Sequence, residues 1–217
     1  PKTTGVVELL DYPLAEIREF IDWTPFFAAW EIKGRFPDVL NQPGVGEAAR
    51  KLYDDAQEMI DRIIAEKWLT ANGVIGIFPA NAAGDDIEVY TDQTRTDVRA
   101  RLHTLRQQGQ HRAGVPNRAL ADFVAPKETG LPDHVGAFAV TAGLGAAERI
   151  QAFKAEHDDY SAILLEALAD RFAEAFAECL HQRLRTEFWG YSPDEDFDNE
   201  DLIKERYVGI RPAPGYP

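Results

Sequence analysis

The longest regular pattern in the chain is an apolar repeat that extends from about Asp159 to Phe188. Hydrophobic residues recur there every three or four positions, which places them on one face of an α-helix. The repeat consists of Tyr160, Ile163, Leu164, Ala167, Leu168, Phe172, Ala175, Phe176, Cys179, Leu180 and Leu184. Asp158 or Asp159 can cap the first turn, and Gly190 ends the helix. An apolar face of this length has to be covered, so we expect the other elements to pack around it.

Shorter helices are predicted from the same spacing. One extends over residues 46–68 along an apolar stripe and ends at Asn72–Gly73. Another covers residues 13–23 and ends there because Pro25 disfavours helical geometry at the residue before it. A short one is expected within Asn199–Tyr207.

Short runs of β-branched and aromatic residues, separated by prolines and glycines, predict strands. These runs are Val74–Phe78, Ile87–Tyr90, Leu120–Val124 and Val135–Thr141. A loop over Pro79–Asp86 joins the first two. Residues 98–102 alternate as in a strand, while their neighbours also suit a helix, so both alternatives stay open there.

Composition limits the class of protein. At 217 residues, 45% of them hydrophobic, the chain can bury the core of one domain, with or without an appendage. A formal net charge of -14 argues against general nucleic-acid binding, because that affinity comes from neutralising phosphates. No apolar run approaches the roughly 20 residues of a membrane span. No signal segment begins the sequence, and the single Cys179 excludes an internal disulfide. We therefore expect a cytoplasmic protein without nucleic-acid or membrane partners.

Basic residues gather in one stretch, from Arg95 to Arg118. It contains six arginines and two histidines against one acid, Asp97. Such a stretch is either a face that points into water or a docking surface for an acidic partner. Charge alone leaves both alternatives open.

One side of the long helix is polar. Asp170, Glu174, Glu178 and His181 project from neighbouring positions there. The Glu-x-x-His spacing of Glu178 and His181 is half of a carboxylate-bridged metal site, which needs a second copy from another helix. The sequence has no second copy, so we expect no metal. Glu178 and His181 are expected to lie on a solvated face.

The last seven residues, Arg211–Pro217, contain three prolines. Proline fixes φ and lacks a backbone donor, so this segment cannot be an interior helix or a central strand and should be extended. Its carbonyls and remaining amides can face a ligand, and Gly215 removes the Cβ that would block close approach. A disordered tail is the alternative interpretation from composition.

The Arg-Pro-Ala-Pro-Gly-Tyr-Pro sequence of this segment resembles the S-adenosylmethionine-binding loop of the activation domain of cobalamin-dependent methionine synthase. Further motifs are similar to that family in the same order. They are Ile21–Phe27, Phe78–Asn81, Gly84–Ile87, Leu105–Gln108, Leu120–Pro126, His157–Tyr160, Ala169–Arg171 and Trp189–Tyr191. The resemblance implies an α+β fold, a long central helix wrapped by a bent, mainly antiparallel sheet and further helices. It also implies that residues 1–217 form a single activation domain, truncated at its C-terminal end because the family's domain continues further.

The resemblance implies a ligand site for S-adenosylmethionine. Arg211 would hold the ligand's carboxylate, and Asp22 and Glu174 would face its ammonium and ribose side. The backbone of Ala213, Gly215 and Tyr216 would then contact the adenine and the ribose. This set contains neither a nucleophile with its base nor a metal site, so no residue is assigned as catalytic and the domain alone should not be catalytic.

The implied activity is reductive reactivation within methionine biosynthesis. Cobalamin would sit on a separate domain of the same protein, receive one electron from flavodoxin or another flavin reductase, and accept the methyl group. Asp170 resembles the aspartate that meets the displaced axial histidine of the cobalamin domain. Ala146 stands where a partnering acid is expected, so Glu148 is the substitute candidate. The Arg95–Arg118 stretch is the candidate dock for flavodoxin.

The sequence also allows other functions. A stand-alone module that binds S-adenosylmethionine or a nucleotide, without a redox role, is the main alternative. A Rossmann-type methyltransferase is disfavoured, because no glycine-rich turn follows a strand at the start of a βαβ unit.

Overall fold

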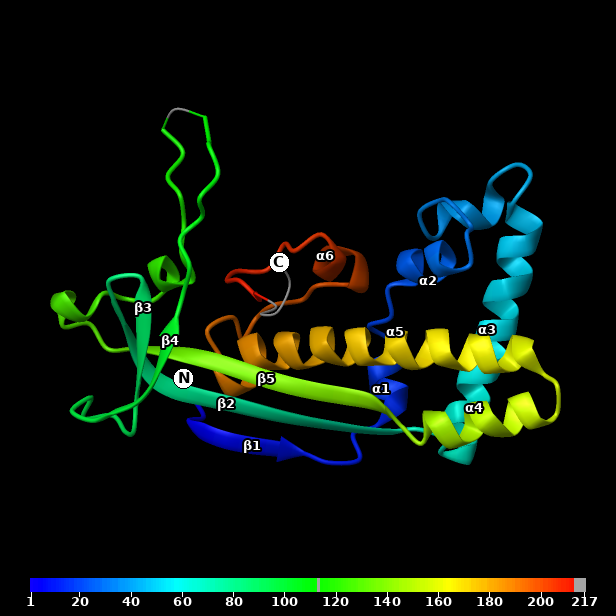
Figure 1. Ribbon diagram of the computed structural model, residues 1–217, viewed down its shortest axis with the longest axis horizontal. Coiled ribbons are helices and arrows are strands. Elements are labelled where there is room, and N and C mark those ends of the chain that lie inside the picture. The colour runs from blue at the N-terminus through cyan, green and yellow to red at the C-terminus, as the bar shows by residue number, and fades with distance from the viewer. Residues whose placement is uncertain (113, 213–217) are drawn as a thin grey trace. The chain divides into compact units, whose positions relative to one another are not determined.

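The computed structural model describes residues 1–112 and 114–212, and they divide into two compact units. The helical unit comprises Glu8–Val74 and the chain from Ala139 onward. The strand unit comprises Pro1–Val7 and Ile75–Phe138. The elements are labelled in Figure 1. Within the described residues, no helix is both long and apolar enough to cross a membrane.

The helical unit is built on α5, Asp159–Arg183, which continues into one π-helical turn, η4, Leu184–Phe188. Its other helices are α1 (Leu14–Arg18), α2 (Trp23–Ala29), η1 (Asp38–Asn41), α3 (Gly46–Glu66), α4 (Ala146–Ala155) and α6 (Asn199–Ile203). The helices α1, α2, α3 and α4 all pack against α5 (Figure 1). The prediction of a long central helix is therefore confirmed.

The start of α5 also follows the sequence pattern. The Asp158 side chain accepts a hydrogen bond from the Ser161 amide at 3.0 Å, which satisfies one of the unpaired donors of the first turn. Phe172 and Phe176 are fully buried. Tyr160 and Ile163, which belong to the same apolar repeat, are instead exposed. The repeat therefore overstates how far the core reaches toward the first turn of α5.

The predicted helix over residues 13–23 is wrong in its extent. The helix α1 ends at Arg18, and α2 begins at Trp23. Asp22 caps α2, since its carboxylate accepts a hydrogen bond from the Thr24 amide at 2.9 Å. Pro25 lies in the first turn of α2, where its missing N–H would have had no helical partner.

The end of α3 also differs from the prediction. The helix stops at Glu66 because Lys67 takes a left-handed conformation with φ of 53° and caps it. Trp68 lies beyond the helix, and its indole donates to Glu66 at 2.8 Å. Asn72–Gly73, predicted to end the helix, lie inside a strand. Near the other end of the chain, α6 stops at Ile203, short of the predicted Tyr207.

The strands form one sheet in the order β1-β2-β3-β4, and β5 also pairs with β2. They are β1 (Gly5–Leu9), β2 (Thr70–Ala83), β3 (Asp86–Tyr90), β4 (Val98–His103) and β5 (Asp133–Leu144). The pairs β2–β3 and β3–β4 are antiparallel, with Ala80 opposite Val89 and Glu88 opposite Arg101. The mixture of helices with antiparallel strands confirms the predicted α+β class.

The strand β2 is longer than predicted. It includes Pro79, which the sequence placed in a loop. The proline is tolerated because the pairing with β3 begins only at Ala80, so no ladder hydrogen bond to β3 is required from its nitrogen. The chain reverses after Ala83 through Gly84, whose φ of 65° suits glycine.

The two remaining strand predictions differ in outcome. Residues 98–103 form the strand β4, which decides between the two alternatives left open. Leu120–Phe123 form a 3-10 turn, η2, so the strand predicted there is wrong. Local bonds explain the turn, since Asp122 accepts from the Ala119 amide at 3.0 Å and the Val124 amide donates to Ala121 at 3.1 Å. A second turn, η3 (Lys127–Thr129), follows.

The burial of α5 yields a test of stability. We expect Phe172→Ala to lower the free energy of unfolding by about 3–5 kcal/mol, because it removes a fully buried ring and leaves a cavity. Ile163→Ala, at an exposed position of the same repeat, should cost less than about 1 kcal/mol. Urea unfolding of both variants measures the difference. Equal losses would contradict the observed burial pattern.

Candidate functional site

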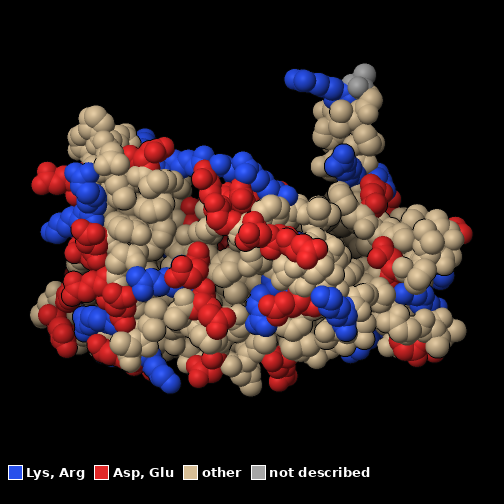
Figure 2. Space-filling view, turned by 180° about the vertical axis from the view of Figure 1, so that it is seen from behind, with Lys and Arg blue, Asp and Glu red and all other residues tan. Residues whose placement is uncertain are grey.

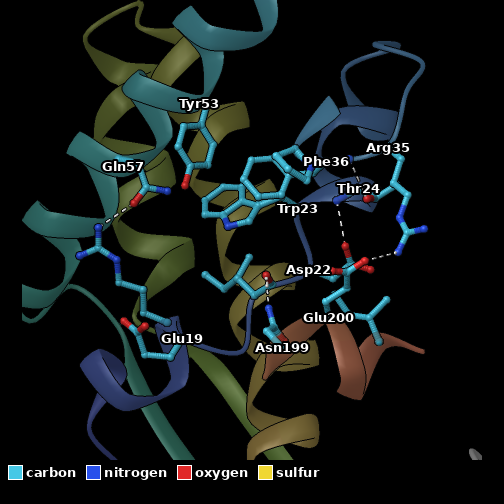
Figure 3. A pocket seen from close by; sticks show the side chains of 14 residues that line it. Glu19, Asp22, Trp23, Thr24, Arg35, Phe36, Tyr53, Gln57, Asn199 and Glu200 are labelled. Atoms are coloured by element: carbon cyan, nitrogen blue, oxygen red, sulfur yellow. Dashed lines mark hydrogen bonds and ion pairs between the residues drawn. The ribbon is translucent and has the colours of Figure 1, made fainter. Parts of the chain in front are cut away.

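The first predicted ligand residue, Asp22, lies at the edge of a pocket of about 410 Å³ (Figure 3). The pocket is formed by the α1–α2 connection, the loop around Phe36, and residues of α3 and α6. Its lining comprises Arg18, Glu19, Ile21, Asp22, Trp23, Thr24, Arg35, Phe36, Pro37, Tyr53, Gln57, Asn199, Glu200 and Ile203. Glu174 and Arg211 are not among these residues.

Aromatic rings make one wall of this pocket. The ring centroids of Trp23 and Tyr53 are 4.9 Å apart, and those of Phe36 and Tyr53 are 5.3 Å apart. The rim is polar, because Asn199 donates to the Ile21 carbonyl at 3.0 Å and Arg35 approaches Glu200 at 3.5 Å. The pocket therefore offers both ring faces and charged groups beside the Asp22 carboxylate.

The second predicted ligand residue, Arg211, is held against α5. Its Nη2 lies 2.8 Å from Oε2 of Glu178. The side chains of Glu178 and Arg211 are only 13% and 28% exposed. Arg211 is thus the point at which the C-terminal end of the described chain is attached to the central helix. Ala213, Gly215 and Tyr216 lie outside the described residues.

The other two predicted residues are exposed on α5. Glu174 is one turn before Glu178, and Asp170 is one turn before Glu174. Asp170 forms a short contact with the neighbouring Arg171. Among the described residues, no hydrogen bond or ion pair joins Asp22 to Glu174 or to Arg211. Arg211 therefore contacts α5 at Glu178, one turn after Glu174, whereas Asp22 caps α2, a helix that packs against α5.

A buried polar network lies at the C-terminal end of α5 and in η4. Arg185 is fully buried and forms two hydrogen bonds with Glu195, at 2.8 and 2.6 Å. A third N–H donates to Nδ1 of His181 at 2.7 Å. The guanidinium carbon of Arg185 lies 4.1 Å from the ring centroid of Tyr207, and the same ring meets His181 edge-on at 4.8 Å. These contacts fold the chain after α5 back onto the helix.

The predicted solvated face for Glu178 and His181 is wrong, because His181 is buried and the Glu178 side chain is only 13% exposed. Burial and the nearby cations Arg185 and Arg211 lower the pKa of His181 to about 3. The ring is neutral, since Nδ1 accepts from Arg185 and the proton is then on Nε2. Burial also raises the pKa of Glu178, against the opposing pull of Arg211 and Arg185.

Sequence reasoning missed Arg185, Glu195 and Tyr207. The spacing of four between His181 and Arg185 was a usable signal, because residues at that interval are neighbours on a helix. Nothing marked Glu195, which stands in an acidic stretch that resembles a surface loop. As for a metal site, the described part of the chain contains no group of three or more His, Cys, Asp and Glu side chains that could hold an ion.

The chain was compared with known proteins. The family model described as "Vitamin B12 dependent methionine synthase, activation domain" matches residues 13–217. A solved structure described as "Crystal Structure of the MetH Reactivation Domain bound to AdoHcy" is 52% identical in sequence and superposes with a TM-score of 0.95. The match covers 99% of this chain and 66% of that chain. The chain thus spans slightly less than two thirds of the protein it matches.

The buried histidine predicts a pH dependence of stability. Below about 6.5 the unfolded chain gains a proton on His181 that the folded chain accepts only near 3. The free energy of unfolding should therefore fall as the pH is lowered through this window, by at most about 1.4 kcal/mol per pH unit. The raised pKa of Glu178 acts in the opposite direction, because the folded chain binds that proton first.

Urea unfolding at a series of pH values measures this dependence. His181→Gln removes the titrating group, so its slope between about pH 6.5 and 5 should be smaller than that of the wild type. His157→Gln changes an exposed histidine and serves as the control. A His181→Gln slope equal to the wild type would contradict the neutral, buried state of His181.

Proposed function

We propose a function for this chain, which belongs to the family of vitamin B12-dependent methionine synthase activation domains. In this proposal the chain binds S-adenosylmethionine and presents its methyl group to cobalamin carried by another domain of the same protein. The observation that carries the proposal is the 52% identity to a reactivation domain described as bound to AdoHcy. AdoHcy is what remains of S-adenosylmethionine once the methyl group has left.

The charges of the proposed ligand residues match those of the ligand. S-adenosylmethionine carries a sulfonium, an ammonium and one carboxylate, so its site needs more acids than bases. Arg211 supplies the base, and Asp22 and Glu174 supply the acids. Exposure of Glu174 on α5 leaves its carboxylate available to a ligand. The backbone of Ala213, Gly215 and Tyr216 completes the proposed site at the adenine and ribose.

Arg211 is suited to a carboxylate because its guanidinium has five N–H donors in a planar fork. Nη2 contacts Glu178, and the donors that this contact does not use can bind the ligand. Two parallel hydrogen bonds to a carboxylate would fix the amino-acid end of the ligand.

Transfer of the methyl group needs an external nucleophile. Cobalamin on another domain would supply that nucleophile once flavodoxin or another flavin reductase had provided one electron, and the electrons of the broken C–S bond would remain on sulfur. The residues of this chain supply placement, because holding two reactants in line removes much of the entropic barrier. Exposed Asp170, one turn from Glu174, is the proposed contact for the cobalamin domain. A cytoplasmic location, where such a reductase can act, is part of the proposal.

The proposed dock for the reductase is narrower than the whole basic stretch. Arg101 pairs with the buried Glu88 at 2.6 Å, and Arg106 binds Asp85 and Asp122 at 2.6 and 2.8 Å. These arginines stabilise the strand unit. The segment between β4 and η2 carries Arg112, and basic side chains mark it where it projects in Figure 2. Among the described residues, no ion pair joins Arg99 or Arg112 to a carboxylate, so these two are the proposed docking arginines.

Binding of AdoHcy tests the ligand site. We expect Arg211→Ala to lose one charge-assisted contact worth about 1.5 to 3 kcal/mol, which weakens binding by roughly ten- to a hundredfold. Calorimetric titration of AdoHcy into both forms of the chain measures this loss. Arg206→Ala, which removes an exposed arginine of the same segment, should bind like the wild type. If the Arg211→Ala variant bound AdoHcy as tightly as the wild type, the proposed role of this residue would be contradicted.

Reactivation tests the dock in the longer protein that contains this chain. Because charge complementarity speeds encounter, Arg99→Glu combined with Arg112→Glu should slow flavodoxin-driven reactivation by roughly tenfold at low salt and reduce its salt dependence. Lys154→Glu reverses an exposed charge on α4 and serves as the control. Unchanged rate and salt dependence in the double variant would place the dock elsewhere.

A further inference from the structure

Glu178 is a buried acid to which the ligand site described above gives no role. It lies on α5 one turn after Glu174, and its side chain is 13% exposed. One carboxylate oxygen, Oε2, contacts Nη2 of Arg211 at 2.8 Å. The other oxygen, Oε1, is buried and has no hydrogen-bond partner among the described residues. The contact with Arg211 is therefore the principal one that this carboxylate makes.

Stability alone does not account for a carboxylate at this position. Removing a charge from water costs several kcal/mol, and a buried ion pair often contributes no more than well-packed apolar side chains of the same volume. Burial indeed raises the pKa of Glu178. An acid kept here at such a cost has to act through the group that it touches, and that group is Arg211.

The neighbouring cation does not compete for Glu178. Arg185 lies in η4, about two turns after Glu178, but its donors are directed to Glu195 and His181. Its guanidinium face is covered by Tyr207 at 4.1 Å. His181 is neutral, and its Nδ1 lies 4.0 Å from Oε1 of Glu178. Among the described residues, Arg211 is thus the cation that pairs with Glu178.

The contact with Glu178 lowers the entropy that the Arg211 side chain loses when a ligand binds. An arginine side chain has many rotamers, and the entropy lost when a ligand fixes it lowers the affinity. The contact with Glu178 fixes the guanidinium before the ligand arrives. It uses Nη2 and leaves other donors of the fork for a carboxylate.

The structure assigns Glu178 as a positioning residue, which holds the guanidinium of Arg211 so that its remaining donors meet the carboxylate of the ligand's amino-acid part. This inference rests on the proposed function, because it assumes that Arg211 binds that carboxylate. It adds a specificity role. Glu178 favours ligands that carry the amino-acid part over ligands that carry only the adenosine part.

Two ligands separate this role from a merely structural one. AdoHcy contains the amino-acid carboxylate, whereas 5′-methylthioadenosine contains the adenosine and the sulfur without it. Calorimetry gives the Kd of AdoHcy, and displacement of AdoHcy gives that of methylthioadenosine. The variants are Glu178→Ala, Glu178→Gln and the control Glu166→Ala, which removes an exposed glutamate of the same helix.

Glu178→Ala should weaken AdoHcy binding by about two- to tenfold, the cost of ordering one long side chain, and should leave methylthioadenosine unaffected. Glu178→Gln keeps an oxygen acceptor for Arg211 and should restore part of the loss. Glu166→Ala should match the wild type for both ligands. An equal loss for both ligands would show a structural role, and tighter AdoHcy binding would show that Glu178 competes with the ligand; either result overturns the inference.

A double-mutant cycle gives an independent test. If Glu178 acts only through Arg211, adding Glu178→Ala to Arg211→Ala should not weaken AdoHcy binding further. Additive losses would overturn the positioning role. Failure of the proposed function gives a different pattern, since the wild type would then not bind AdoHcy or Arg211→Ala would bind it normally. A normal Glu178→Ala beside an impaired Arg211→Ala contradicts the positioning role alone.

Discussion

The buried ion pair between Arg185 and Glu195 is the constraint on which the proposed ligand site depends. Their side chains are 0% and 3% exposed, and breaking such a pair leaves an uncompensated charge that costs about 3–5 kcal/mol. The chain that leaves α5 must therefore return to it at Glu195. Tyr207 and Arg211 then meet the same helix at Arg185 and Glu178. The position of Arg211 follows from this return.

The central helix α5 has an apolar side that packs in the core and another side that carries acidic residues. One side carries the apolar residues that α1, α2, α3 and α4 cover, which fixes the helix in place. Successive turns on another side carry Asp170, Glu174 and Glu178. A rigid helix holds such groups with less variation than a loop does, and ligand sites gain from that precision. The fold thus places the acids on its most constrained element and the proposed ligand base, Arg211, on the segment that packs against it.

The sequence predicted the elements that local periodicity determines, and it failed where distant contacts decide. The long helix was found because its repeat extends over many turns, and β3 and β5 because their residues favour strands. The turn at Leu120–Phe123 was misread, since the Asp122 carboxylate accepts a hydrogen bond from the Ala119 amide there. The resemblance supplied Asp22 and Arg211 as candidate ligand residues, but it did not supply the contacts that they make in the structure. The burial of His181 could not be predicted, because the groups that cover it come from residues after α5.

Glu174 and Glu178 show why residue type alone cannot assign a role. They are the same amino acid, four positions apart on one helix, and helical periodicity alone places both on the same polar side. The return of the chain buries Glu178 against Arg211 and leaves Glu174 exposed. A buried acid already paired with an arginine is electrically satisfied, so it cannot also neutralise a cationic ligand without releasing that partner. Among the described residues, the exposed Glu174 has no such partner to release and can neutralise a cationic ligand. The division between a ligand acid and a positioning acid therefore arises from burial.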